Sequence, residues 1–359
     1  MIRRLRDYYR QFEELSPEEI SAELRERRGA ERASALTEVH PLDLASPAWH
    51  EPPDAEAVNA ATYALRRAVN TYPDDGALRR ALAERHGVSE DQVAPGHGAG
   101  ELLHAAFRAI AASGRVAIAW PGWSPLPQLV HEAGGTPLPV PLTAGGAPDV
   151  DALVALGSDM RAVVLSSPND PTGASTDLRA LAAGLPEPVW LLVDAALAEL
   201  APDEDVAGLL AARERVLVVR SFSKAHAMAG LRAGYVLGND ADLLDRLSPA
   251  GGVSAPAQAA MLWAVRDGDR VVVRRRAAAA RERERLAAAL RGSPFSFPAG
   301  HGHLVWLSSH EEDGASLARR LAAQRIYVTP GAMWGDEQHV RVALRDGAAT
   351  DRLVGALLG

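Results

Sequence analysis

The residues that most clearly suggest chemistry are a lysine and its neighbours in residues 216–238. Lys224 follows an apolar, β-branched run, and Ser221 and Ser223 come just before it. Eight residues after the lysine, Arg232 stands in a Gly-Leu-Arg-Ala-Gly-Tyr segment. Hydroxyls and a guanidinium are common ligands of phosphate, and a lysine amine can react with a carbonyl carbon. The stretch therefore predicts an amine beside a bound phosphate, as a cofactor that carries both an aldehyde and a phosphate would need.

A glycine-rich loop and a tryptophan offer two weaker signals. Residues 96–100 read Gly-His-Gly-Ala-Gly and lead into a predicted helix, so the backbone amides of Ala99 and Gly100 could bind an anion. An ordinary turn explains the same loop. Trp123 follows a predicted strand in a turn bounded by prolines. Its ring either stacks on a flat ligand or caps the core.

Two further polar residues follow predicted strands. Asn169 lies in Ser-Pro-Asn-Asp-Pro-Thr-Gly, where it either makes a turn or donates a side-chain N–H to a ring oxygen. Asp194 ends an apolar run, so we expect its carboxylate to be buried and to need a partner. That partner is either the N-terminus of a helix or a protonated ring nitrogen.

These residues need a sheet that brings strand ends together. We predict strands at 115–120, 162–166, 189–194, 216–220 and 234–237, all nearly continuous apolar runs. Such runs are typical of a mostly parallel sheet buried on both faces, whose ligands bind beyond the carboxyl ends of the strands. After residue 240 we predict a long helix over 257–291 and a smaller α+β region with strands near 303–309, 327–329 and 340–344.

Length and composition set the class of protein. The 359 residues suit one large domain with a smaller companion, and we predict a helical arm at 1–50, a large domain at 51–245 and a small domain at 246–359. The net charge of −8 argues against nucleic-acid and membrane-surface partners. The chain has no cysteine, no membrane-length apolar run and no apolar signal-peptide core, so we expect a cytoplasmic protein without disulfides or a metal site.

Seven short motifs occur in an order that resembles the fold-type I pyridoxal-phosphate enzymes. They are Tyr-Pro-Asp, Gly-x-Gly-x-x-Glu, Pro-x-aromatic, Ser-Pro-Asn-x-Pro-Thr-Gly, Asp-x-Ala, Ser-x-Ser-Lys and Gly-Leu-Arg-x-Gly-Tyr. The order is most similar to the histidinol-phosphate aminotransferase branch of the class I/II aminotransferases, from about residue 42 onward. The resemblance implies an α/β fold with a seven-stranded, mostly parallel sheet between helices and a smaller α+β domain. It also implies amino transfer between an α-amino acid and a 2-oxo acid.

The resemblance further implies a role for each motif residue. Lys224 would form the Schiff base with pyridoxal 5'-phosphate and carry the proton, and Asp194 would pair with the pyridine nitrogen. Asn169 would bind the ring hydroxyl oxygen and Trp123 would stack on the ring. The phosphate ligands would be Ala99, Gly100, Ser221, Ser223, Arg232 and, from a second copy in a homodimer, Tyr72. Arg341 would bind the substrate carboxylate.

Three departures keep other reactions open. Leu197 stands where the family has a tyrosine that reaches the ring hydroxyl, Thr329 stands near where the histidinol-phosphate branch carries a further arginine, and His97 occupies a loop position that is usually small. A decarboxylase, lyase or cyclase on the same scaffold is therefore the alternative to an aminotransferase. A DNA-binding regulator and a nicotinamide-binding enzyme fit the sequence poorly, because no basic module and no complete Gly-x-Gly-x-x-Gly fingerprint is present.

Overall fold

The computed structural model describes residue 25 and residues 40–359. Residues 43–359 form one compact unit. The helices that we predict within residues 1–40, and most of the predicted arm at 1–50, lie outside the described residues. None of the helices in the described part combines the length and the apolar character that crossing a membrane requires.

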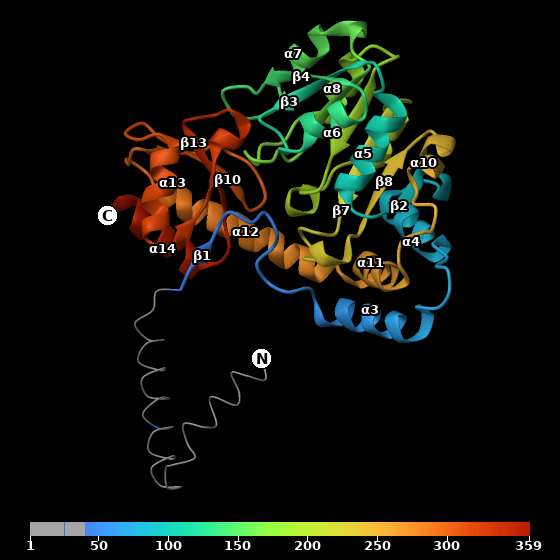
Figure 1. The fold of residues 1–359 in the computed structure, drawn as a ribbon, viewed down its shortest axis with the longest axis horizontal. Coiled ribbons are helices and arrows are strands. Elements are labelled where there is room, and N and C mark those ends of the chain that lie inside the picture. The colour runs from blue at the N-terminus through green and yellow to red at the C-terminus, as the bar shows by residue number, and fades with distance from the viewer. Residues whose placement is uncertain (1–24, 26–39) are drawn as a thin grey trace, which may run out of the picture. The chain divides into compact units, whose positions relative to one another are not determined.

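The centre of the unit is one sheet of seven strands (Figure 1). The strands are β2 (Val93–Gly96), β3 (Arg115–Trp120), β4 (Thr136–Pro141), β5 (Ala162–Ser166), β6 (Trp190–Asp194), β7 (Val216–Ser221) and β8 (Gly234–Gly238). Their order is β2-β8-β7-β6-β5-β3-β4, with β8 antiparallel to both neighbours and the other pairs parallel. The predicted seven-stranded, mostly parallel sheet is confirmed.

Successive side chains of a strand point to opposite sides of the sheet, so strands that are apolar throughout give the sheet two apolar faces. Helices cover both of these faces. In β7, Val216 and Val218 join one apolar cluster, while Leu217 and Val219 join the other. The first cluster includes helices α4 (Gly76–His86), α7 (Val150–Ala155), α8 (Leu178–Gly184), α9 (Val206–Ala212) and α11 (Ala255–Asp267). The second includes α5 (Ala99–Ile110), α6 (Leu126–Glu132) and α10 (Ala241–Leu247). Helix α3 (Ala55–Ala68) packs on α11.

Two strands of this sheet escaped prediction, and they are its two edge strands. β4 reads Thr-Pro-Leu-Pro-Val-Pro and pairs only with β3. Proline cannot donate to a neighbouring strand, but every second residue of an edge strand directs its N–H away from the sheet. The prolines at 137, 139 and 141 keep that spacing. β2 likewise contains Pro95 and pairs only with β8.

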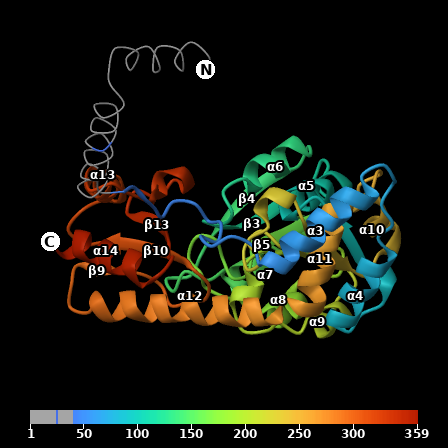
Figure 2. The same cartoon turned by 90° about the horizontal axis from the view of Figure 1, so that it is seen from below.

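The chain then leaves the large sheet along two helices. We predict a single helix over 257–291, but Gly268 ends α11 and α12 (Asp269–Ala289) begins directly after it. Figure 2 shows α12 as a long orange helix that reaches from α11 to the smaller sheet. That sheet has the order β12-β13-β10-β9. Its elements are β9 (Phe295–Ser296), β10 (Leu304–Ser309), β12 (Thr329–Pro330) and β13 (His339–Ala343), with helices α13 (Gly314–Ala323) and α14 (Gly347–Leu358).

Short elements complete the described chain. The remaining strands are β1 (Leu42–Asp43) and β11 (Ile326–Tyr327). The 3-10 helices are η1 (Glu90–Gln92), η2 (Gly157–Asp159), η3 (Ala198–Leu200), η4 (Ala229–Leu231) and η5 (Gly331–Trp334). The division into domains near residue 245 stays a prediction, since residues 43–359 are a single compact unit.

Residues 45–48 form an irregular segment with bends at Ala45 and Ala48 that runs from the smaller sheet toward the large one, and we call it the strap. The residue before it is held by two backbone hydrogen bonds: the N–H of Leu44 donates to Tyr327, and the N–H of Ala343 donates to Leu44. Just beyond the strap, the buried ring of Trp49 packs in a cluster with Leu197. The strap is thereby fixed beside the carboxyl ends of the large sheet.

Candidate active site

The carboxyl ends of three parallel strands meet at one cavity. β5 ends at Ser166 and β6 at Asp194, and these two residues are register partners. β7 ends at Ser221. Beyond these ends lies a cavity of about 280 Å³, and its walls include Lys224, Asp194, Ser221, Ser223, Trp123 and Arg232. The structure therefore brings together most of the residues that the sequence singles out.

The start of α5 forms one wall of this cavity, and glycines allow the approach. Gly98 has φ +86°, and a Cβ there would lie 2.8 Å from Nη2 of Arg232. A Cβ on Gly234 would lie 2.8 Å from Cα of Gly98 and 3.0 Å from the amide nitrogen of Ala99. The first N–H groups of α5 have no partner within the helix and carry its positive partial charge. The loop, the helix start and Arg232 thus bring positive charge together in this wall, an arrangement that favours an anion.

Lys224 extends its amine into the cavity from the turn after β7. Its Nζ donates a hydrogen bond of 3.2 Å to the carbonyl oxygen of Pro47 in the strap. Burial lowers the pKa of Lys224, and Arg341 and Arg232 lower it further, while Asp170 and Asp194 oppose the change. Within the described residues the amine forms no ion pair. A lowered pKa leaves more of a lysine uncharged and nucleophilic.

Asp194 is almost fully buried at the end of β6. Its Oδ1 accepts from the N–H of Ala196 at 3.1 Å, and its Oδ2 accepts from Oγ of Ser166 at 3.1 Å. Burial raises the pKa of Asp194 to about 6, with Asp170 adding to the rise. No cationic side chain of the described chain pairs with this carboxylate, so it suits a cationic group of a ligand.

Asn169 is not among the residues that line the cavity, and its predicted contact with a bound ring stays a prediction. Its side chain is fully buried, and its Nδ2 donates to the carbonyl of Pro121 and to Oγ1 of Thr172, both at 3.1 Å. The next residue, Asp170, lines the cavity instead. The turn between the two prolines directs consecutive side chains to different sides. An acidic side chain beside Asn169 in the same turn was the signal in the sequence that could have pointed to Asp170.

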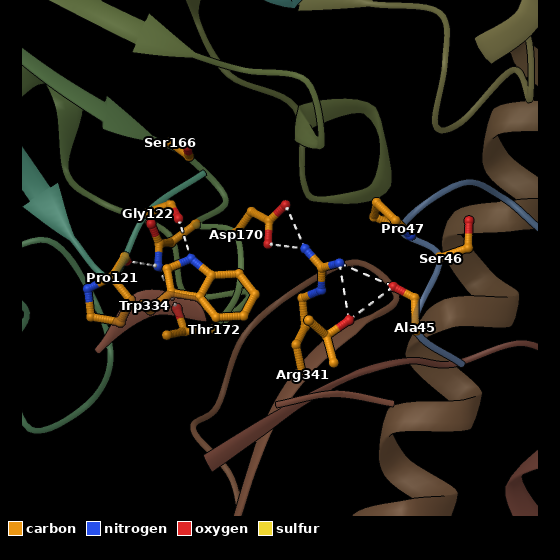
Figure 3. A network of polar contacts seen from close by, with 12 residues as sticks. Ala45, Ser46, Pro47, Pro121, Gly122, Ser166, Asp170, Thr172, Trp334 and Arg341 are labelled. Atoms are coloured by element: carbon orange, nitrogen blue, oxygen red, sulfur yellow. Dashed lines mark hydrogen bonds and ion pairs between the residues drawn. The ribbon is translucent and has the colours of Figure 1, made fainter. Parts of the chain in front are cut away.

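The guanidinium of Arg341 faces the carboxylate of Asp170, as Figure 3 shows. Its Nη1 donates to Asp170 at 3.0 Å to Oδ1 and 3.3 Å to Oδ2. Its Nη2 donates to the carbonyl of Ala45 at 3.0 Å and is 3.5 Å from Oγ1 of Thr329. The guanidinium also stands over the ring of Trp334, 5.3 Å from its centroid. Arg341, which we expect to bind the substrate carboxylate, is thus near the cavity. Its guanidinium, however, is already bound by the carboxylate of Asp170.

Three other residues that the sequence singles out differ in whether they line the cavity. Tyr72 is 94% exposed and does not line the cavity of its own chain. His97 is exposed and is likewise absent from the wall. Leu197 is buried in the wall, so an apolar side chain takes the place where the resemblance has a tyrosine hydroxyl.

The strap and a histidine were missed by sequence reasoning. Ser46, Pro47 and Ala48 line the cavity. His303 is buried, and its Nε2 is 3.0 Å from the same Pro47 carbonyl that receives Lys224. Burial lowers the pKa of His303 to about 3, and Lys224 adds to this, so the ring is neutral and donates from Nε2. The sequence around 41–54 predicts only an extended, proline-rich segment.

A second cavity, of about 660 Å³, lies between α4, α11 and α12 and we call it the polar pocket. Three of its arginines are paired with carboxylates. Arg85 pairs with Asp269 at 2.7 Å, Arg220 with Glu204 at 3.2 Å and Arg276 with Asp203 at 2.7 Å. The exposed Arg266 and Glu84 also line this pocket, so within the described chain most but not all of its arginines are ion-paired.

Comparison with known proteins gives the family. The family model for aminotransferase class I and II matches residues 42–357. An aromatic amino acid aminotransferase of Rhodococcus jostii is 32% identical over 292 residues, covering 79% of this chain and 80% of the relative. A histidinol-phosphate aminotransferase of Rubrobacter xylanophilus is 33% identical over 317 residues, covering 85% and 87%.

Solved structures agree with these relatives. The histidinol-phosphate aminotransferase of Sinorhizobium meliloti in complex with pyridoxal-5'-phosphate has a TM-score of 0.78 and 25% identity, covering 88% of this chain and 89% of that one. The aspartate aminotransferase of Thermus thermophilus with maleate has a TM-score of 0.78 and 25% identity, covering 94% and 95%. The chain therefore belongs to the class I and II aminotransferases and is an enzyme, a transferase of amino groups.

Proposed function

We propose that the protein binds pyridoxal 5'-phosphate in the cavity at Lys224 and transfers amino groups between α-amino acids and 2-oxo acids. The observation that carries the proposal is that Lys224 and Asp194 line the same cavity. An amine of lowered pKa and a buried carboxylate of raised pKa line one cavity, and neither has an ion-pair partner among the described residues. Perturbed groups of opposite type in one cavity are characteristic of active sites.

The residues present fit this cofactor. A cavity of about 280 Å³ is near the lower end of small-molecule sites, which suits a single substituted ring. The groups proposed to bind an anion, at Ala99, Gly100 and Arg232, line the same cavity as the amine, and Asp194 lies on β6. The anion-binding groups suit the cofactor's phosphate, the amine of Lys224 can react with its aldehyde, and the carboxylate of Asp194 suits its basic ring nitrogen.

Lys224 would hold the cofactor through its aldehyde carbon. Bound in this way, pyridoxal phosphate supplies an electron sink that stabilises negative charge at the substrate Cα. Once a substrate amine has taken its place, Nζ of Lys224 would move the proton that leaves and rejoins the substrate. Its lowered pKa suits that task, because an amine must be uncharged to accept a proton.

Asp194 would hold a proton on the ring nitrogen through its buried carboxylate. Trp123 would flank the ring on the α5 side, and Leu197 would supply an apolar wall. The strap, held over the cavity by the contacts of Pro47, would exclude water from the proton transfer.

The phosphate ligands we propose are the amides of Ala99 and Gly100, the hydroxyls of Ser221 and Ser223, and Arg232. Tyr72 would join them from a second copy of the chain, because it is exposed and does not line its own cavity. The proposal therefore includes a homodimer with shared sites. Arg341 would bind the substrate carboxylate, after rearrangement of its contact with Asp170.

Amino transfer itself is the decisive measurement. Protein loaded with pyridoxal 5'-phosphate is incubated with an amino acid and a 2-oxo acid, and the new amino acid is quantified by chromatography. We expect equal amounts of new amino acid and new 2-oxo acid. Release of CO₂ without a new amino acid would support the decarboxylase alternative. A protein that binds no pyridoxal phosphate would contradict the assignment of the cavity.

Shared sites can be tested by complementation between two inactive variants. Lys224→Ala removes the amine of one subunit, and Tyr72→Ala removes the group donated to the other. In a mixed dimer one site carries both changes and one carries neither, so mixing the variants should restore activity. Activity no greater than the sum of the separate variants would contradict the assignment of Tyr72.

A further inference from the structure

The guanidinium of Arg341 has no pair of donors free for a substrate carboxylate. Nη1 is held by both oxygens of Asp170, and Nη2 is held by Ala45 and Thr329. Nε is buried without a partner. Arginine binds a carboxylate most strongly through two parallel N–H groups, and here such a pair is not open.

Asp170 is the group that separates Arg341 from the cavity. Asp170 lines the cavity and is 5% exposed, while Arg341 is 7% exposed and does not line it. The ion pair joins two buried side chains, so solvent screens it little. The other charged groups acting here are Lys224, Asp194 and Arg232.

We propose that Asp170 is a specificity-determining residue, whose carboxylate occupies Arg341 and competes with the α-carboxylate of any substrate. Compared with a site that has a neutral residue at this position, the site disfavours α-amino acids relative to amines of the same shape that lack the carboxylate. A substrate carboxylate meets the repulsion of Asp170 and must displace it from Nη1. An amine without that carboxylate leaves the ion pair intact.

The inference rests on the proposed function only for its consequence on substrates, and the first test is independent of catalysis. Succinate and 3-phenylpropionate, which have no amine to transfer, are titrated calorimetrically into the protein with its bound cofactor. Asp170→Asn keeps the shape of the side chain and removes its charge. We expect this variant to bind both acids at least about tenfold more tightly, a change of about 1.4 kcal/mol.

Three further variants make the titration specific. Asp170→Ser should tighten binding in the same direction, which guards against a folding defect of one variant. Adding Arg341→Gln to Asp170→Asn should abolish the gain. Glu204→Gln is the matched control, since Glu204 pairs with the buried Arg220 at 3.2 Å outside this cavity, and it should leave the affinity unchanged. Unchanged or weaker binding in both Asp170 variants would overturn the proposal.

The second test compares two amino donors that differ only in the carboxylate, phenylalanine and 2-phenylethylamine. Asp170→Asn should raise the ratio of kcat/KM for phenylalanine over the amine by about tenfold or more. An unchanged ratio would overturn the proposal. If no variant transfers amino groups while the titrations still separate Asp170→Asn from the native protein, the proposed function fails and the assignment of Asp170 stands.

Discussion

The polar pocket and the Lys224 cavity differ in how many charged side chains line them and in how those charges are satisfied. The polar pocket is the larger, at about 660 Å³ against about 280 Å³, and is rich in arginine and carboxylate side chains. Three of its four arginines, Arg85, Arg220 and Arg276, are paired at 2.7 to 3.2 Å, and the fourth, Arg266, is exposed. In the Lys224 cavity, among the described residues, Lys224, Arg232 and Asp194 form no ion pair. The buried carboxylate of Asp194 and the half-buried amine of Lys224 both lack an ion pair within the described chain, and they mark this cavity rather than the larger one as the place for a charged ligand.

Two buried carboxylates show the same contrast in their proton affinity. Burial raises the pKa of Asp194 to about 6. Burial also acts on Glu199, at the wall of the polar pocket, but His226, Arg220 and Arg85 outweigh it and lower the pKa to about 2. Burial alone therefore does not decide the direction of the shift. The neighbouring cations do.

The largest expected effect is on Lys224. Lys224→Ala should lower amino transfer by at least about 10³-fold, because it removes both the attachment point and the proton carrier. Initial rates with saturating cofactor measure this. A variant that keeps a tenth or more of the native rate would show that the cavity at Lys224 is not where the chemistry occurs.

The next effect is a pH dependence caused by Asp194 in the cofactor-free protein. Its pKa is higher in the folded protein, about 6, than the ordinary value of 3.8. Below pH 3.8 the carboxyl is protonated in both the folded and the unfolded protein, so the raised pKa does not change the unfolding free energy. As pH rises toward 6, the unfolded protein ionises first, and the unfolding free energy of the native protein falls. Asp194→Asn should gain stability relative to the native protein over that range, by up to about 3 kcal/mol. Urea unfolding between pH 4 and pH 7 measures the difference, and a constant difference would contradict it.

For Glu199, the effect of the carboxylate on the unfolding free energy should have the opposite sign. Its folded pKa of about 2 is below the ordinary 4.5, so its stabilising contribution is complete above pH 4.5 and is lost as pH falls toward 2. Glu199→Gln should lose up to about 3 kcal/mol of unfolding free energy at neutral pH and less as the solution is acidified. The same urea series measures it, and equal losses at pH 3 and pH 7 would contradict the role of its cationic neighbours.

The smallest effect is expected at Arg276, which pairs with an exposed Asp203. Arg276→Gln should change the unfolding free energy by less than about 1 kcal/mol, as surface ion pairs contribute little. It should also change the rate of amino transfer by less than about twofold. A large loss of rate with normal stability would show that the polar pocket takes part in function.

The sequence predicts the central strands well because their signal is local. The buried runs at 115–120 and 162–166 coincide with β3 and β5. The edge strands β2 and β4 were missed because proline, which ordinarily argues against a strand, is tolerated where one side of the strand is unpaired. The break at Gly268 was missed because a lone glycine does not by itself end a helix.

The candidate site was predicted unevenly for a similar reason. Lys224, Asp194 and Ser221 stand at or just after strand ends, so the topology alone places them at one edge. Asn169 and Asp170 are adjacent in a turn, and only the surrounding structure decides which of them faces the cavity. The strap could not be found at all, since Pro47 acts through its carbonyl, which every residue has.

The contact between Ala45 and Arg341 joins residues that are 296 positions apart in the chain. Contacts of such long range form late, because the intervening chain must be ordered before they close. The carbonyls of the strap are also what Lys224 and His303 contact. A folding intermediate with a complete central sheet would thus have the amine and the anion site but an open cavity. Tight retention of a ligand there would report that folding is finished, not merely begun.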